Sequence, residues 1–379
     1  MSAWTRAQLE ALPTASISGL PRIELSDITP IADGIDIWDS WPIRTPDGSI
    51  ADVCGHEMWV ALAAPADNDP SLRHDIAELR AFLVDENRGF VDLGPLFAPG
   101  EPLGSRQWAG STVLDGDEIT VFYTAAGVGG AATPGFRQRP AVTIGTLDCG
   151  PGRPSISGWS THRQILEPNP EWYDTADAVD GKPGFIKAFR DPFPFVDPVT
   201  GRQVLLVTAS LSPEHSRSEF NGAVGIATRT SSRETWELLE PLVTADGVNN
   251  ELERPHLVVH DDLYYLFFST QARTFHPEVT APTGLYGFVA SKLLGPYEPL
   301  NGHGLVFANP PERPLQAYSW TVLNDLRVIG FVDAVGIDGA TGENMFDDPE
   351  DRRRGAFGGT LSPAVRLTLR GSQAAVATP

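Results

Sequence analysis

A carboxylate stands between two tryptophans in the stretch WDSWP, residues 38–42. Tryptophan favours burial, whereas an aspartate that is buried needs a partner or takes up a proton. A solvated loop has no need of the two indole rings, and a core strand has no need of the charge. A buried carboxylate whose surroundings set its protonation state is suited to act as a nucleophile or as a general acid. We therefore expect Asp39 to be buried for a chemical purpose.

Two further acidic stretches have a similar composition. In FRDPFPF (189–195) Asp191 lies between Arg190 and a proline, and in NNELERPH (249–256) Glu251 and Glu253 precede an arginine and a proline. Each stretch alone is more often a turn or a solvated strand edge. Taken together, they indicate a site where carboxylates converge. Mutual repulsion and burial would keep one carboxyl protonated as a general acid, while an arginine or hydrogen bonds keep another ionised.

The elements that must position these carboxylates are predicted to be strands. Short β-branched and aromatic runs such as 57–64, 118–125, 203–210 and 263–270 recur along the chain, bounded by turn residues. Helical periodicity is confined to about 3–12 and 74–84. We interpret the chain as all-β and place the three acidic stretches between strands. A propeller of four-stranded blades requires about this length, and its corners meet around a central funnel.

The organisation along the chain indicates one catalytic domain over residues 1–379. No internal repeat and no shift in composition marks a boundary. The chain begins with a short helical segment at about 3–12. It ends in a small, polar tail at about 371–379 that we expect to be loose.

Charge and hydropathy restrict the partners. The chain of 379 residues has 28 basic and 49 acidic side chains and a net charge of −21, so we expect neither nucleic acid nor anionic membrane as a partner. No apolar run has the length of a membrane span. Residues 1–21 lack the pattern of a signal peptide. We expect a protein that is cytoplasmic, that is exported by a leaderless route, or that has lost a leader.

Two cysteines, Cys54 and Cys149, cannot form a CxxC-type metal site. Two free buried thiols are the favoured interpretation, and one disulfide is the alternative. The eight histidines show no metal-ligand spacing such as HExxH. We therefore expect neither a required metal nor a cofactor.

In this order the three acidic stretches resemble the levansucrase/inulosucrase/β-fructofuranosidase family, glycoside hydrolase family 68. The resemblance continues through QWAGST (107–112), LYYLFFSTQ (263–271), QAYSW (316–320) and GGTLSPAVRLTL (358–369), and covers roughly residues 4–370. It implies a five-bladed β-propeller with a central axial active-site pocket. It also implies a retaining reaction on sucrose, in which water, sucrose or a growing fructan accepts the fructosyl group.

The resemblance also implies roles for individual residues. Asp39 would be the nucleophile, Glu253 the general acid/base and Asp191 the transition-state stabiliser. Retention requires the nucleophile and the acid to lie about 5–5.5 Å apart. Trp38 and Trp41 would form walls of the pocket around Asp39. The residues that would bind the sugars are Trp38, Trp108, Arg190, Glu251 and Arg254, with Gln271 and Tyr318 on the acceptor side.

Four positions depart from the family pattern. Ala109 stands where many members have a serine that orients the nucleophile, and Ser111 is a candidate replacement. Gln271 stands where many have arginine or histidine, and Trp320 where a histidine is usual. Asn250 stands where calcium-binding members have aspartate. The changes at Gln271 and Trp320 affect the acceptor half of the site and leave the fructosyl-donor half intact.

Alternative functions remain open at this point. A transferase that builds levan or fructo-oligosaccharides with some sucrose hydrolysis is the first. A predominantly hydrolytic, invertase-like β-fructofuranosidase on the same site is the second, because the two differ only in the acceptor. A non-catalytic sugar-binding propeller and a propeller glycosidase for other sugars are minor alternatives. The linkage of any product, β-2,6 or β-2,1, is not readable from the sequence.

Overall fold

The apolar runs form antiparallel strands whose central members are buried. In the computed structural model, β16 (Leu263–Thr270) is buried along nearly its whole length and pairs with β15 on one side and β17 on the other. A continuous apolar run bounded by turn residues is typical of such a strand. The structure describes residues 1–12, 19–85, 89–131, 135–178, 181–229, 235–335 and 350–377.

The strands form blades of antiparallel sheet. The described residues form three sheets of five strands and one of nine, and the nine-stranded sheet divides where β2 pairs in parallel with β6, which gives five blades. The blades comprise β2 (Ile35–Arg44), β3 (Met58–Pro65), β4 (Glu78–Val84) and β5 (Phe90–Pro95); β6 (Arg106–Asp115), β7 (Glu118–Ala126), β8 (Gln138–Asp148), β9 (Ser155–Ser157) and β10 (Arg163–Gln164); β11 (Phe189–Val196), β12 (Gln203–Ser210), β13 (Gly222–Arg229), β14 (Glu237–Thr244) and β1 (Ser2–Ala3); β15 (Glu253–His260), β16, β17 (Gly284–Ala290), β18 (Glu298–Pro299) and β19 (Leu305–Ala308); and β20 (Ala317–Val322), β21 (Arg327–Ala334), β22 (Phe357–Leu361), β23 (Val365–Arg370) and β24 (Gln373–Val376).

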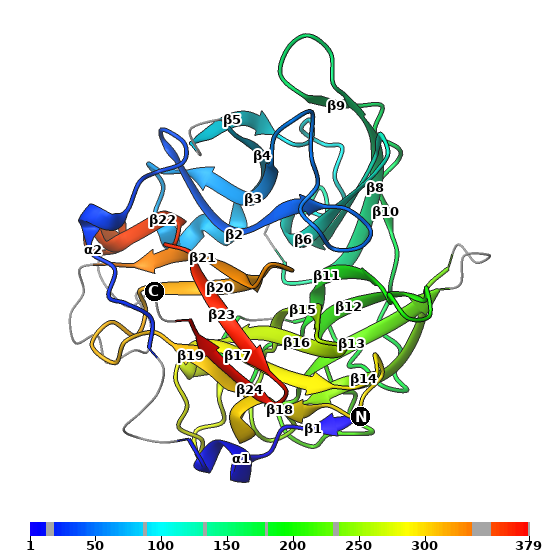
Figure 1. Ribbon diagram of the computed structural model, residues 1–379, viewed down its shortest axis with the longest axis vertical. Helices are drawn as coiled ribbons and strands as arrows, with labels where there is room; N and C mark the ends of the chain where they lie inside the picture. Colours follow the sequence, from blue (N-terminus) through cyan, green and yellow to red (C-terminus); the bar gives the residue numbers. More distant parts are fainter. Residues whose placement is uncertain are drawn as a thin grey trace.

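The first long strand of each blade lies at the centre of the molecule. β2, β6, β11, β15 and β20 contact one another in a closed ring, with β20 next to β2 again, and they surround the middle of the view in Figure 1. The outer strands point toward the rim. The predicted five-bladed β-propeller is therefore confirmed, and its axis is lined by one strand from each blade.

Helices are short and peripheral. They are α1 (Arg6–Glu10), α2 (Glu350–Ala356) and the 3-10 segments η1 (Leu25–Asp27), η2 (Pro70–Asp75), η3 (Ala272–Thr274) and η4 (Leu300–Gly302). The side chains of Arg353 and Arg354 in α2 pair with Asp69 and Asp36, so α2 ties the last blade to the first. Within the described ranges, no helix has the length and hydropathy to cross a bilayer.

Three local expectations are corrected by the structure. The helix expected over 3–12 is only α1, which a capping box at Thr5 begins. The helix expected over 74–84 is instead the end of η2 and the strand β4, because pairing with β3 and β5 outweighs the local pattern. The expected loose tail forms β24 against β23, and the Tyr265 hydroxyl donates to the Gly371 carbonyl. Residues 378–379 lie outside the described residues.

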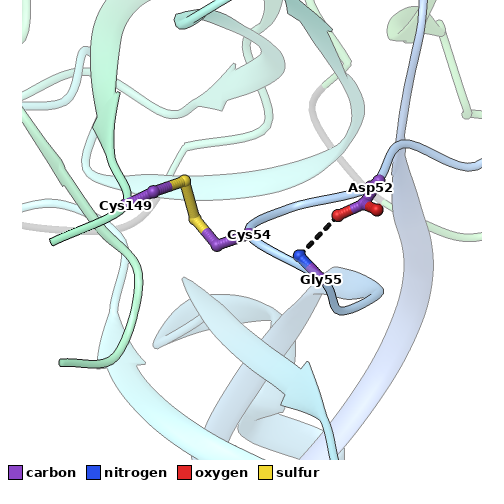
Figure 2. The surroundings of a disulfide bond; sticks show 4 residues. All are labelled: Asp52, Cys54, Gly55 and Cys149. Atoms are coloured by element: carbon purple, nitrogen blue, oxygen red, sulfur yellow. Dashed lines mark hydrogen bonds between the residues drawn. A yellow bond between two sulfur atoms is a disulfide. The ribbon is translucent and has the colours of Figure 1, made fainter. Parts of the chain in front are cut away.

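The favoured interpretation of two free thiols is also wrong. Cys54 and Cys149 form a disulfide across 95 residues of sequence, which Figure 2 shows between the β2–β3 connection and the segment after β8. Cys54 has a φ of 55° in a turn where the Asp52 carboxylate accepts from the Gly55 amide. This turn places its sulfur beside the exposed Cys149. The bond links the first and second blades, a proximity that no local pattern in the sequence reveals.

Candidate active site

The inner strands share one local distortion. The pairing register of each shifts at the same level, between Trp38 and Trp41, Trp108 and Ser111, Arg190 and Phe193, Glu253 and His256, and Tyr318 and Thr321. Such bulges turn a side chain out of the pleat. The acidic stretches thus lie within β2 and β11 and at the start of β15, whereas we expected them between strands.

The bulges hold four side chains in a strained backbone conformation. The φ value is 43° at Asp39, 59° at Asp191, 50° at Arg254 and 57° at Ser319. A non-glycine residue in this region costs of the order of 1–3 kcal/mol, and such strain clusters at functional sites. The side chains of these four residues line the cavity at the propeller axis.

All ten side chains that we expected to react with or bind the sugars line one cavity of about 360 Å³ at the propeller axis. These are the carboxylates Asp39, Asp191 and Glu253 and the proposed sugar-binding residues Trp38, Trp108, Arg190, Glu251, Arg254, Gln271 and Tyr318. The same cavity is also lined by nine polar residues that the sequence motifs did not indicate, which are Ser71, Arg73, His74, Asp75, Gln138, Lys182, Arg273, Ser319 and Asp333.

Asp39 is held by a residue other than the one expected. Burial raises the pKa of Asp39, while the charge of Arg254 and a hydrogen bond from Ser319 oppose that rise. The Ser319 hydroxyl also accepts from Arg254 Nη1 at 2.8 Å. Ser111, the candidate substitute for the serine missing at Ala109, lines a different cavity. Ser319 on β20 therefore orients Asp39.

Asp191 is buried and immobilised. Its Oδ2 accepts from the Thr208 hydroxyl at 2.8 Å and from the Arg254 backbone amide at 3.1 Å. Burial raises the pKa of Asp191 to about 6, opposed by the charge of Arg190 and assisted by the charges of Glu253 and Asp39. The carboxyls on β2, β11 and β15 thus act on one another electrostatically, as the sequence predicted.

Glu253 takes part in a network with Glu251. Arg190 Nη2 donates to Glu253 Oε1 at 2.9 Å and also to Glu251 Oε1, and Arg190 Nη1 donates to Gln138. The Tyr318 hydroxyl donates to Glu253 Oε2. Burial raises the pKa of Glu251, and the charge of Glu253 adds to this rise. Both oxygens of Glu253 are therefore engaged in directed hydrogen bonds at the cavity wall.

Aromatic rings form one wall. The edges of Trp38 and Trp108 meet the His74 ring, with centroids 5.5 Å and 6.0 Å away, and Trp108 Nε1 donates to the His74 carbonyl at 2.8 Å. Burial lowers the pKa of His74 well below its ordinary value, so its ring is neutral. Trp41, which we expected as a second wall beside Asp39, lines the smaller cavity instead and donates to the Thr112 hydroxyl.

Next to Gln271, which we expected on the acceptor side, the cavity contains an arginine that the sequence motifs did not indicate. Arg273 in η3 donates from Nε to Gln271 Oε1 at 2.7 Å. Burial raises the pKa values of Glu251 and Asp333, and the charge of Arg273 opposes that rise at both carboxyls. A guanidinium is thus present two residues beyond the position where many members have one. Trp320, which stands where a histidine is usual, is 1% exposed and packs on Phe307, so it is part of the hydrophobic core. The sequence offered one indication of this guanidinium, because Arg273 follows Gln271 by two residues.

Asn250 makes direct hydrogen bonds where calcium-binding members have aspartate. Its Oδ1 accepts from the Gly184 amide at 2.6 Å, and its Nδ2 donates to the carbonyls of Ile186 and Glu219, each at 3.1 Å. The amide joins two loops to the stretch that carries Glu251. Over the described part of the chain, no group of three or more His, Cys, Asp or Glu side chains could hold a metal ion.

The arrangement provides carboxyls on separate strands facing one enclosed space, with arginines and an aromatic wall around them. Carboxyls in such a pair can share the work of nucleophile and acid on a glycosidic bond. Arginines and carboxylates bind hydroxyl groups with strong, directed hydrogen bonds. This geometry matches the chemistry that the sequence motifs indicated.

Comparisons with known proteins agree with this site. The profile of the Levansucrase/Invertase family matches residues 1–220 and 214–378. A levansucrase of Pseudomonas syringae pv. actinidiae is 31% identical over 413 residues, which cover 98% of this chain and 90% of that protein. An inulosucrase from Halalkalicoccus jeotgali bound to kestose is 40% identical, with a TM-score of 0.91, and the match covers 99% of this chain and 95% of that one.

A more distant structure has the same fold. The catalytic domain of a Microbacterium saccharophilum K-1 β-fructofuranosidase has a TM-score of 0.83 at 23% identity, with 100% of this chain and 90% of that chain covered. The family match spans nearly the whole sequence, and the residues that carry the motifs meet in one cavity. The chain therefore belongs to the Levansucrase/Invertase family.

Proposed function

We propose that this protein is a retaining fructosyltransferase of the levansucrase type. It uses sucrose as the donor, forms levan or fructo-oligosaccharides, and hydrolyses some of the sucrose. The observation that carries this proposal is the convergence of Asp39, Asp191 and Glu253 on one cavity. Support comes from the family match and from the relatives described as a levansucrase and an inulosucrase.

Asp39 is the proposed nucleophile and Glu253 the proposed general acid/base. A carboxylate oxygen of Asp39 attacks the anomeric carbon of the fructosyl unit, the glycosidic bond breaks, and the proton of Glu253 passes to the departing glucose oxygen. In the second step Glu253 takes a proton from the acceptor hydroxyl, which displaces Asp39. The position of Glu253 against the Tyr318 hydroxyl and Arg190 orients it for both proton transfers.

Asp191 is the proposed transition-state stabiliser. Positive charge develops on the sugar ring as the bond to glucose breaks, and a fixed carboxylate lowers the energy of that charge without reorganising. The bonds from Thr208 and from the Arg254 amide hold its carboxylate in place. The indole rings of Trp38 and Trp108 would pack on the sugar and exclude water from one side.

The acceptor decides between polymer, oligosaccharide and hydrolysis. The cavity that contains Glu253 is also lined by Glu251, Gln271, Arg273 and Tyr318. Tyr318 donates to Glu253, and Arg273 donates to Gln271. We propose that Arg273 supplies the guanidinium that binds hydroxyls of the leaving glucose and of the incoming sugar. A predominantly hydrolytic enzyme remains the alternative, in which water takes the place of that sugar.

The test is a product balance. Purified protein is incubated with concentrated sucrose, and glucose, free fructose and longer fructosides are quantified together, with the Asp39→Ala variant as control. Glucose in excess of free fructose indicates transfer, and the linkage of the longer products then follows. Equal amounts indicate the hydrolase. An absence of glucose release would contradict sucrose as the donor, and activity above a few per cent in the variant would contradict the role of Asp39.

We also propose that the protein works outside the reducing cytosol, on neutral sugars rather than on nucleic acid or membrane. The Cys54–Cys149 disulfide supports this location, because reducing compartments keep such thiols free. The net charge of −21 supports the choice of partners. Alkylation of thiols in intact producing cells, followed by mass spectrometry, should find the two cysteines unmodified. Two alkylated cysteines would place the protein in the cytosol.

A further inference from the structure

A second, smaller cavity lies on the propeller axis behind the catalytic carboxylates. It is lined by Asp191 and Arg254, which also line the catalytic cavity, and by Arg44, Ser111 and Thr321. Its free volume is about 20 Å³. This volume suffices for one water molecule or one ion of similar size, because a single water requires about 10–15 Å³.

Arg44 brings a positive charge to this cavity without a matching carboxylate. Its guanidinium carbon lies 4.1 Å from the centroid of the Phe193 ring. Among the described residues, Arg44 forms no ion pair and no side-chain hydrogen bond. Burial and the nearby charge of Arg254 lower the pKa of Arg44 to about 10. A partly buried cation next to a second cation gains from any anion that neutralises it.

Ser111 contributes a hydroxyl that is also without a partner. It is 3% exposed and lines the cavity, and no described residue donates to or accepts from its hydroxyl. Thr321 is half-buried and lines the same cavity, and its hydroxyl is likewise unpaired within the described chain. Buried hydroxyls normally find a hydrogen-bond partner. Two unpaired hydroxyls and one guanidinium thus offer donors to whatever occupies the cavity.

The remaining polar groups around the cavity are already engaged. His256 shares a hydrogen bond through Nδ1 with the Arg254 carbonyl, and its Nε2 accepts from the Val322 amide. Its ring is therefore neutral, in agreement with a pKa that burial lowers to about 3. Asp191 Oδ2, at the catalytic end, accepts from Thr208 and from the Arg254 amide. The charge of Asp191 favours an anion position at the Arg44 end.

We propose that this axial cavity is a binding site for a single halide-sized anion, held by the guanidinium of Arg44 and the hydroxyls of Ser111 and Thr321. Sulfate, phosphate and sugar carboxylates are too large for the space. The proposal of this site does not rest on the proposed catalytic function. Its ligand connects to catalysis through Arg254, which donates to the Ser40 carbonyl and to Ser319 and so supports the bulges next to Asp39.

The first measurement locates the ion. Crystals grown in sodium gluconate are soaked in sodium bromide, and anomalous scattering is measured at the bromine absorption edge. We expect a bromide peak in the axial cavity next to Arg44. A cavity that contains only water, with no anomalous signal, would overturn the proposal.

The second measurement separates halide binding from general salt effects. The Tm is compared in sodium chloride and in sodium gluconate at equal ionic strength, for the wild type and for Ser111→Ala, Arg44→Gln and Arg370→Gln. Arg370 is exposed and makes no side-chain interaction with a described residue, so its variant is the control for loss of one charge.

We expect the chloride-minus-gluconate difference to saturate at about 2 °C or more in the wild type and in Arg370→Gln. It should be lost in Ser111→Ala and in Arg44→Gln. If Arg44→Gln does not fold, the Tm difference of Ser111→Ala and the anomalous bromide map still test the proposed anion site. An equal difference in the wild type and in Ser111→Ala would contradict a site built on that hydroxyl.

Discussion

Asp191 combines a strained backbone, burial and a raised pKa. The unfolded chain ionises this carboxyl near 3.8 and the folded chain near 6, so the folded state binds the proton more tightly. Its contribution to stability is complete below pH 3.8 and is lost as the pH rises through about 6. The proposed reaction, however, needs the ionised form. Stability and activity therefore make opposite demands on this residue.

This conflict gives the first prediction. Asp191→Asn should lower kcat by about 10²–10³-fold, since a neutral amide does not stabilise developing positive charge. At pH 7 the variant should be more stable than the wild type by about 1–3 kcal/mol, and the gain should shrink toward pH 4. Thermal unfolding across pH measures this difference. Wild-type activity should fall below about pH 6. If the wild type and Asp191→Asn were equally stable at pH 7, ionisation of Asp191 would not destabilise the folded state.

Ser319 gives the second prediction. Its hydroxyl connects Asp39 to Arg254, in the place of the serine that is absent at position 109. A hydrogen bond to a charged group contributes about 1.5–3 kcal/mol, so Ser319→Ala should reduce kcat by about 10–100-fold with little change in KM. Adding Ala109→Ser should restore part of the loss. Steady-state kinetics of both single variants and of the double variant provide a double-mutant cycle. Additive effects of the two substitutions on kcat would contradict a shared role of the two serines in orienting Asp39.

At the scale of elements, the unit of function is the bulged inner strand. One strand from each blade carries one distortion at the same level, and the outer strands hold it in register. The loops between blades are tied to these strands by buried polar side chains. Asn250 is such a tie, since its amide joins residues 184–186 and Glu219 to the residue before Glu251.

Removal of metals and a change of this amide give the third prediction. Chelation by EDTA should leave the activity and Tm of the wild type unchanged, since the Asn250 amide donates to both carbonyls itself. In Asn250→Asp a carboxylate would face the Ile186 and Glu219 carbonyls. The variant should lose about 1–3 kcal/mol of stability. Calcium, which binds such oxygens, should restore part of this loss.

The control for this experiment is Asn250→Ala, which removes the hydrogen bonds without adding charge. It should be destabilised to a similar extent and should not respond to calcium. A wild type that lost activity in EDTA would contradict the prediction, and so would a calcium response of the alanine variant.

At the scale of the whole molecule, acidic charge is the prominent property. The chain has 49 acidic residues and only three lysines, Lys182, Lys187 and Lys292, within a net charge of −21. Like charges on a compact surface repel one another and favour the expanded, unfolded chain. The disulfide and the ion pairs of α2 oppose that expansion by joining the first blade to the second and to the fifth.

This charge gives the fourth prediction. The Tm should rise by several degrees between about 0.1 M and about 1 M salt, since the screening length shortens from about 10 Å to about 3 Å. Sodium gluconate should have this effect as well as sodium chloride, because screening depends on ionic strength. Differential scanning calorimetry across both salt series measures it. A Tm that stays level or falls with salt would show that surface repulsion does not limit stability.

The sequence by itself determined the fold class and the members of the site. Short apolar runs between turns indicated an all-β chain, and three acidic stretches in a fixed order indicated the family. The ten residues expected to react with or bind the sugars meet in one cavity, because residue type and order along the chain carry that information, whereas Trp41, expected as a wall, lines the smaller cavity. The strand at 78–84 could not be predicted, since its form depends on pairing with β3 and β5.

The tertiary structure alone decided how the site is held. Ser319 and Arg273 lie far from Asp39 in sequence, and only the closure of the ring brings them to the same cavity. The Cys54–Cys149 bond spans 95 residues, so no local pattern reveals it. The positive φ of Asp39, Asp191 and Arg254 results from bulges in paired strands. Local propensity acts over a few residues, whereas these features are set by contacts between blades.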